Sequence, residues 1–129
     1  MLYKKFEDLP IWQKARELSS IVFLITQEGD FSKDFRFKDQ IRSSSGSVMD
    51  NIGEGYERGG NKEFCQFLYI AKGSCGETRS QCRRALDYNY ITKLQHDNLI
   101  NKCEILSSEI YLLIKYIKNS EFKGEKYNY

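Results

Sequence analysis

Apolar residues recur along most of this chain at alternating steps of three and four, the spacing that places side chains on one face of an α-helix. The first such segment starts after Asp8, a candidate cap, has Pro10 in its opening turn and ends before Gly29. We predict a helix of about five turns there. Its apolar face contains Ile11, Ala15, Leu18, Val22 and Ile25.

A second apolar face runs from about residue 36 to residue 53, but its middle is rich in serine and glycine. The run Ser43–Ser47 has poor helix propensity and is also typical of a flexible linker. We favour a helix, because the flanking apolar residues stay in phase with one stripe and small side chains let a neighbour approach closely. The stripe comprises Phe37, Ile41, Val48 and Ile52, with Ser44 and Ser45 bridging its gap.

Two more helices are predicted in the second half of the chain. One follows Gly59 and Gly60, with Asn61 as its candidate cap. The other begins at Thr92, whose hydroxyl can cap the helix while Gln95 reaches back in a capping box. Their apolar faces contain Phe64, Leu68, Ala71, Cys75, Thr78, Cys82 and Ala85 in the former, and Leu99, Cys103, Leu106, Ile110, Leu113 and Ile117 in the latter.

These segments predict an all-α fold, an antiparallel up-and-down four-helix bundle, with one domain over residues 1–119 and a flexible tail over residues 120–129. No segment has the pattern of a strand. Several large aromatic residues fall outside the stripes, which indicates contacts between subunits. They are Trp12, Phe23, Phe67, Tyr69, Tyr111 and Tyr116.

Charge and cysteine content narrow the class of protein. The 20 basic and 18 acidic side chains leave a net charge of +2, so any binding of nucleic acid or anionic lipid must be local. No stretch approaches the roughly 20 apolar residues that span a bilayer, and the first residues lack the apolar segment of a secretion signal, so we expect a cytoplasmic protein. The cysteines lack metal-ligand spacing, and we predict reduced core residues at Cys65, Cys75, Cys82 and Cys103.

Two glycine motifs resemble ligand-binding loops. A Gly-x-Gly motif at residues 53–55, with a glycine pair at 59–60, follows a helix and lacks the Gly-Lys-Ser/Thr ending, so nucleotide binding is not predicted. Gly73 and Gly76 match the Gly-x-x-Gly clamp of KH domains, yet they lie inside the apolar rhythm of the third helix. We interpret them as sites of close helix packing.

Two lone carboxylates, Glu54 and Glu77, are the candidates for acid-base or di-metal chemistry. A di-iron bundle needs Glu-x-x-His pairs, and the single histidine, His96, has no such partner. We therefore predict no catalytic residue, no metal and no cofactor. We expect Glu54 or Glu77 to pair with Arg42, or to accept bonds from backbone donors near Gly55.

Basic residues gather on one side of the third predicted helix, namely Lys72, Arg79, Arg83 and the adjacent Arg84. Such a stripe can neutralise phosphates, and repetition in an oligomer would multiply the contacts; a solvated helix face is the alternative. Tyr69 and Tyr88 suit stacking on the bases of single-stranded RNA, or packing against neighbouring helices.

Four motifs in a fixed order carry a resemblance to a known family. They are FEDLPIWQKA at residues 6–15, DQIR at 39–42, NIGEG at 51–55 and FLYIAKGS at 67–74. Together they resemble the four-helix bundle proteins encoded in intervening sequences of bacterial 23S ribosomal RNA genes. The resemblance covers about Tyr3 to Ser120.

The resemblance implies a ring-like homopentamer without enzymatic activity. It also implies structural similarity to the accessory variability determinant protein of diversity-generating retroelements, which binds nucleic acid and a reverse transcriptase. The family pattern has Arg-Arg-Ala after Gln-Ile in the second helix, whereas this chain reads Arg42-Ser43-Ser44. One positive charge is therefore missing from that face.

Two functional hypotheses follow. The first is an oligomeric accessory protein that binds RNA or DNA through Lys72, Arg79, Arg83, Arg84 and Arg42. The alternative is a scaffold that docks a protein partner through exposed aromatic side chains. The candidates for structural polar contacts or oligomer contacts are Asn51, Glu54, Glu77 and Trp12.

Overall fold

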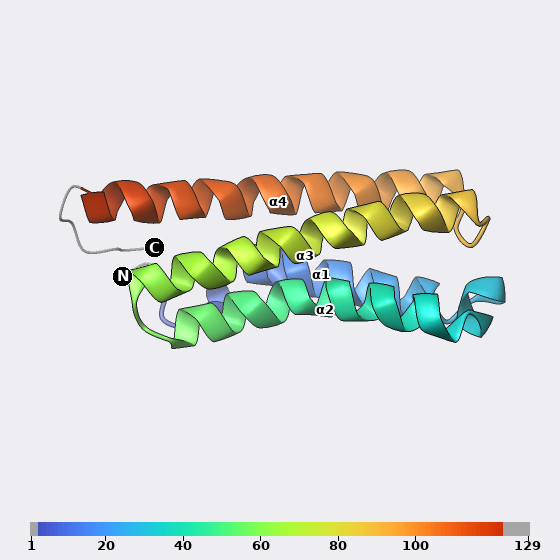
Figure 1. Ribbon diagram of the computed structural model, residues 1–129, viewed down its shortest axis with the longest axis horizontal. Helices are drawn as coiled ribbons and strands as arrows, with labels where there is room; N and C mark the ends of the chain where they lie inside the picture. The colour runs from blue at the N-terminus through green and yellow to red at the C-terminus, as the bar shows by residue number, and fades with distance from the viewer. Residues whose placement is uncertain (1–2, 123–129) are drawn as a thin grey trace.

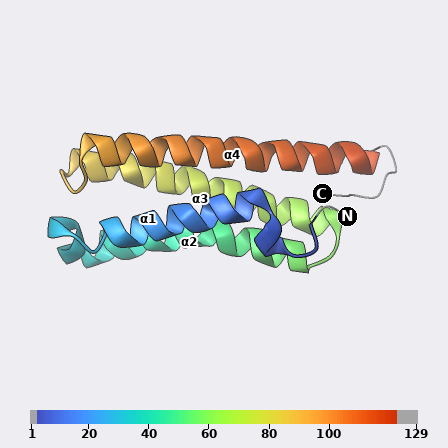
Figure 2. The ribbon, with the colours of Figure 1, turned by 180° about the vertical axis from the view of Figure 1, so that it is seen from behind.

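The computed structural model describes residues 3–122, and it contains four long helices joined by short connections (Figure 1). Successive helices run in opposite directions, with α1 and α2 forming one layer and α3 and α4 the other (Figures 1 and 2). Residues 3–122 contain no strand, so the predicted all-α four-helix bundle is confirmed. The elements are η1 (Phe6–Asp8), α1 (Pro10–Ile25), η2 (Gly29–Lys33), α2 (Phe35–Glu57), α3 (Asn61–Asp87) and α4 (Lys93–Phe122).

The predicted apolar stripes form the core between the two layers. Every predicted stripe residue of α2 and α3 is buried, as are four of α1. In α4 the stripe shifts after Ile110, because Ile114 is buried while Leu113 is only half-buried at the core margin. Extensive packing joins α3 to both α2 and α4, whereas α1 and α4 meet over a shorter stretch.

The serine-rich segment is a continuous part of α2, so the helix prediction is confirmed over the linker alternative. Its two buried serines have hydrogen-bond partners. The Ser44 hydroxyl lies 2.9 Å from Thr78 Oγ1 and 2.5 Å from Gln81 Oε1, and Ser45 donates to the carbonyl of Ile41 at 2.8 Å. Because these polar groups are satisfied, burial of the small side chains does not leave an orphaned donor between α2 and α3.

One helix cap was predicted correctly and two were not. At the start of α4 the Gln95 amide donates to Thr92 Oγ1 at 3.1 Å, and the Thr92 amide donates to Gln95 Oε1 at 2.9 Å, which confirms the capping box. Asp8 and Asn61 are not caps, because the capping positions are Leu9 and Gly60 and neither provides a side-chain bond. Both helices begin one residue away from the expected site.

α4 continues to Phe122, past the domain boundary predicted at residue 119, and Ser120 is buried. The rest of the predicted tail, residues 123–129, lies outside the described residues. All four cysteines are buried free thiols, as predicted. No helix among residues 3–122 has the length and apolar character that crossing a membrane requires.

Gly55 allows α2 and α3 to approach closely. A Cβ atom added at Gly55 would lie 2.5 Å from Cβ of Phe67 and 3.2 Å from Cδ1 of Phe64. Gly73 and Gly76 are different, because a Cβ atom there would meet nothing within 4 Å. The prediction that these two glycines serve close packing is wrong within the single chain.

Replacing Gly55 with alanine tests this close approach. We expect Gly55→Ala to lower the free energy of unfolding by about 1–3 kcal/mol, because the new methyl group forces the two helices apart. The matched change on the same helix, Gly46→Ala, places its methyl group in open space and should instead stabilise the chain by about 0.5–1 kcal/mol. Urea unfolding measures both values, and equal effects of the two changes would contradict the packing assignment.

Asp34 joins the start of α2 to the loop between α3 and α4. Its carboxylate accepts the Tyr90 hydroxyl at 2.8 Å and the Phe37 amide at 3.1 Å. These two bonds hold the pKa of Asp34 below its ordinary value of 3.8. The bond between Tyr90 and Asp34 also raises the pKa of Tyr90. This cap was not predicted from the sequence.

Acid titration tests the Asp34 contact. A carboxylate with a lowered pKa in the folded state stabilises the protein above the ordinary pKa, and that stabilisation disappears as pH falls through the lowered value. We therefore expect Asp34→Ala to reduce the melting temperature near neutral pH, and the difference from the wild type to shrink well below pH 3.8. Asp30→Ala, at an exposed carboxylate in η2, is the control and should leave the melting temperature unchanged.

Candidate nucleic-acid interface

A row of basic side chains lies along the side of α3 next to α4. Lys72, Arg79 and Arg83 follow one another at helical spacing, and Gly76 occupies the position between the first two. Arg83 is exposed, and no hydrogen bond or ion pair of its side chain is found among residues 3–122. The structure therefore brings together three of the predicted basic residues.

Side chains of α4 face this row across a hollow. The hollow is lined by Lys72, Arg79, Glu104, Ser107, Ser108 and Tyr111. Arg79 Nη1 lies 3.7 Å from Glu104 Oε2, an exposed ion pair that contributes little to stability and leaves the guanidinium accessible. The hollow thus combines cations, hydroxyl groups and one aromatic ring.

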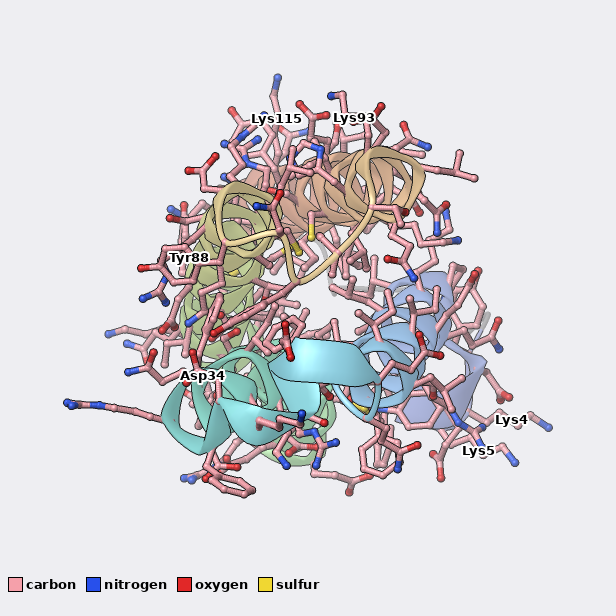
Figure 3. All side chains as sticks on the ribbon, turned by 90° about the vertical axis from the view of Figure 1, so that its right-hand side faces the viewer. Lys4, Lys5, Asp34, Tyr88, Lys93 and Lys115 are labelled. Atoms are coloured by element: carbon pink, nitrogen blue, oxygen red, sulfur yellow. The ribbon has the colours of Figure 1, made fainter. Side chains whose placement is uncertain are left out.

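Two lysines of α4 extend the basic surface toward the end of the helix. Lys118 Nζ donates to the Tyr69 hydroxyl at 2.8 Å and lies 4.8 Å from the centre of that ring. Lys115 points away from the bundle (Figure 3). We call this surface the α3–α4 basic face, defined by Lys72, Arg79, Arg83, Lys115 and Lys118 with Tyr69 and Tyr111.

The contribution of α4 to this face was not predicted from the sequence, where the basic stripe was assigned to α3 alone. A signal was present, since Glu104, Ser108, Tyr111, Lys115 and Lys118 follow one another at steps of four and three. The pairing of this row with α3 could only be predicted once the orientation of α4 was known.

Arg84 and Arg42 lie elsewhere. The Arg84 guanidinium lies 4.1 Å from the centre of the Phe37 ring and donates to Gln40 Oε1 at 3.4 Å, on the side of α3 that faces α2. Arg42 donates to Thr26 Oγ1 at 2.8 Å and to the Phe23 carbonyl at 3.5 Å. Its positive charge therefore lies at the carbonyl end of α1, where it is favourable.

The predicted pairing of Glu54 or Glu77 with Arg42 is wrong. Glu54 Oε1 accepts a bond from Arg58 at 2.8 Å, one helical turn later, and Glu77 accepts one from Gln81 at 3.3 Å. Both glutamates are exposed. Arg42 lies on α2 twelve residues before Glu54, about 18 Å away along the helix, so the two cannot meet. Each glutamate instead pairs with the side chain four residues later, because i and i+4 side chains are neighbours on a helix.

The remaining structural candidates lie in the α1–α2 layer. The Asn51 amide donates to the carbonyl and to the hydroxyl of Ser47, both at 2.8 Å. Trp12 is half-buried, and its ring meets Phe6 edge-on at 5.5 Å. Of the other aromatic residues outside the stripes, Phe67 is half-buried, and the exposed ones are Phe23, Tyr69, Tyr111 and Tyr116.

Tyr88, the second tyrosine proposed for base stacking, lies at the end of α3. Its ring meets Phe37 and Tyr90 edge-on, at centroid distances of 5.8 Å and 5.7 Å. The residue is half exposed, away from the row on α3 that faces α4. It packs within an aromatic cluster and is not part of the α3–α4 basic face.

The thiols of Cys75 and Cys103 lie in contact in the buried core. Cys75 Sγ donates to the Cys103 carbonyl at 3.2 Å. The side-chain contact with Cys103, together with burial, raises the pKa of the Cys75 thiol. The pKa of Cys103 rises to about 12, because the contact with Cys82 and burial outweigh the lowering by Cys75. Both thiols stay protonated at neutral pH. No group of histidine, cysteine or acidic residues within 3–122 is arranged to hold a metal ion.

The fold and these side chains define an up-and-down helical bundle whose distinctive chemistry lies on its outer surface. The chain belongs to the family described as 23S rRNA-intervening sequence protein, whose sequence model matches residues 7–122. The resemblance inferred from the four motifs is therefore confirmed.

A solved structure supports the same fold. It is a crystal structure of a protein of unknown function from the S23 ribosomal protein family of Bacteroides thetaiotaomicron, with a TM-score of 0.74 and 22% sequence identity. The match covers 81% of this chain and 98% of that protein. No curated protein matches the sequence.

Proposed function

We propose that this protein is a non-enzymatic, self-assembling helical bundle that binds RNA or another nucleic acid through the α3–α4 basic face. The observation that carries the proposal is the concentration of five cations and two tyrosines on adjacent sides of α3 and α4. Glu104 is the acidic side chain that lines the hollow among them. A local excess of positive charge matters here because the net charge of the whole chain is only +2.

The dimensions of the basic row suit a nucleic-acid backbone. The residues from Lys72 to Arg83 span about 16 Å along α3, at 1.5 Å per residue. One strand of a DNA duplex presents a phosphate every 3.4 Å or so of helix axis, so about five phosphates of such a strand pass along that length. Gly76 leaves open space within the row, which lets a phosphate backbone come close to the helix.

The family connection makes RNA the first polymer to test, because the family description names an intervening sequence of ribosomal RNA. The tyrosines add a preference for unpaired bases. Tyr69 and Tyr111 are both about half exposed, and aromatic rings beside a basic row support stacking on single-stranded segments.

Self-assembly, as a homopentamer, is the second part of the proposal. An outward row on α4 contains the exposed residues Ile105, Leu112 and Tyr116, on the side away from α3. Leu112 and Tyr116 also line a hollow with Lys115 and Lys118, so a second copy covering this row would remove apolar surface from water and leave open the part of the basic face on α3. Repetition of that face around a ring would multiply weak phosphate contacts.

Salt dependence and one charge change test nucleic-acid binding. We expect a fluorescently labelled hairpin RNA with a single-stranded loop to bind at low salt and to lose affinity steeply as salt rises. Arg83→Gln should weaken binding equally for different RNA sequences. It should also reduce the slope of the logarithm of affinity against the logarithm of salt concentration by about one for each chain that contacts the RNA. Arg36→Gln, an exposed arginine on α2, is the matched control and should have no effect. Negligible affinity at low salt, or affinity independent of salt, would show that the proposal is wrong.

Sedimentation equilibrium tests the assembly. Leu112 is 58% exposed and Leu24, near the end of α1, is 59% exposed, so the same change can be made at two matched surface positions. We expect the wild-type chain to sediment as a pentamer, Leu112→Glu to dissociate it, and Leu24→Glu to leave it intact. A wild-type chain that stays monomeric at every concentration would contradict self-assembly. The exposed row on α4 would then favour the scaffold hypothesis, in which a different protein docks there.

A further inference from the structure

A second surface of distinct chemistry lies in the α1–α2 layer, where η1 and the start of α1 meet the later part of α2. It is a cleft lined by Phe6, Trp12, Met49, Asp50, Gly53, Glu54 and Glu57. We call it the acid–aromatic cleft. Its aromatic rings come from the N-terminal part of the chain, and all three of its carboxylates come from α2.

The aromatic part of the cleft is held in place by several contacts. Phe6 meets Trp12 edge-on at 5.5 Å and Tyr56 at 6.4 Å, and Gln13 donates to the Glu7 carbonyl at 3.0 Å, which ties η1 to α1. The Phe6 ring also rests near the backbone of α2, since a Cβ added at Gly53 would lie 3.5 Å from it. The rings are therefore fixed before any ligand arrives, which limits the entropy lost on binding.

The acidic part of the cleft has unused bonding capacity. Asp50, Glu54 and Glu57 are exposed and follow one another at steps of four and three, so like charges lie on one side of α2. Glu54 pairs with Arg58, but no hydrogen bond or ion pair of Asp50 or Glu57 is found among residues 3–122. A cation placed in the cleft would relieve this repulsion.

The nearby cations of the chain do not fill the cleft. Arg16 Cζ lies 5.6 Å from the centre of the Trp12 ring but is not among the lining residues, and Arg58 Cζ lies 5.1 Å from the centre of the Phe67 ring. Lys4 and Lys5 point away from the bundle (Figure 3). The recognition chemistry of the cleft is thus available to a group from outside the chain.

We propose that the acid–aromatic cleft binds an arginine side chain of a partner protein. A guanidinium group is planar, is more weakly hydrated than an ammonium group and stacks on aromatic rings, while its fork of donors matches carboxylates. Carboxylates beside an indole ring satisfy both requirements at once. Phosphate groups are repelled by the same carboxylates, so nucleic acid is not the ligand here, and the inference does not depend on the proposed function of the α3–α4 basic face.

Trp12 provides a direct reporter of the cleft, because it is the only tryptophan of the chain. The probe is the capped tripeptide acetyl-Gly-Arg-Gly-amide, titrated into the full-length protein while the indole N–H resonance and the fluorescence of Trp12 are recorded. The control peptide carries citrulline, which keeps the shape of arginine and removes its charge. We expect a saturable response to the arginine peptide and about tenfold weaker binding of the citrulline peptide, since the attraction depends on the charge.

Matched charge changes on α2 separate the cleft from nonspecific attraction. Asp50→Asn combined with Glu57→Gln should weaken arginine binding about tenfold, because charge-assisted bonds are lost, whereas Asp39→Asn on the same helix should not. Circular dichroism verifies that each variant is folded; these exposed changes remove no observed contact. Equal responses to arginine and citrulline, or equal effects of the cleft and control changes, would overturn the proposal.

One more outcome decides the identity of the partner. If the Trp12 resonance shifts when the protein alone is diluted, and if Arg83→Gln abolishes that shift, the occupant is a second copy of this chain and the assignment to a different protein is overturned. A resonance that is independent of protein concentration, together with the arginine response, supports the assignment as stated.

Discussion

Burial of one face of α3 between α2 and α4 is the constraint on which the structure depends. At one end of the contact Gly55 lets the helix backbones approach, and in the middle Ser44, Thr78 and Gln81 satisfy one another where an apolar stripe alone would leave polar groups without partners. The contact between α1 and α4 is shorter, and exposed ion pairs such as Lys102 with Glu17 lie at its edge. Exposed pairs contribute little, so α3 carries most of the cohesion between the layers.

That constraint determines what the rest of α3 is free to do. Because the buried face stabilises the helix, its outer face tolerates Gly73 and Gly76, which weaken an exposed helix and gain no contact within the chain. At Gly73 and Gly76, beside Lys72 and Arg79, no side chain covers the helix backbone, so a molecule outside the chain can approach it more closely than larger side chains would allow. Packing inside the chain does not explain the two glycines, and the proposed approach of a nucleic acid from outside would.

The fold could be predicted from the sequence because buried residues recur at steps of three and four along each helix. The stripes of α2 and α3 are correct residue by residue, and the capping box at Thr92 is correct because all of its partners lie within one turn. Predictions that depend on how helices rotate about their axes were less successful. The exchange of Leu113 for Ile114 follows from such a rotation. The contribution of α4 to the basic face was missed for the same reason. Glu54 pairs with Arg58 for a different reason, because Arg42 lies twelve residues away on the same helix.

The α3–α4 basic face and the acid–aromatic cleft carry opposite charge, and the difference bears on specificity. A phosphate backbone is attracted to the α3–α4 basic face but repelled by the three carboxylates of the acid–aromatic cleft, and a basic protein segment experiences the reverse. Each surface therefore discriminates against the ligand of the other, although the net charge of the chain is only +2. Because the two surfaces belong to different layers, the proposed nucleic-acid ligand and the proposed arginine ligand would not compete for one site.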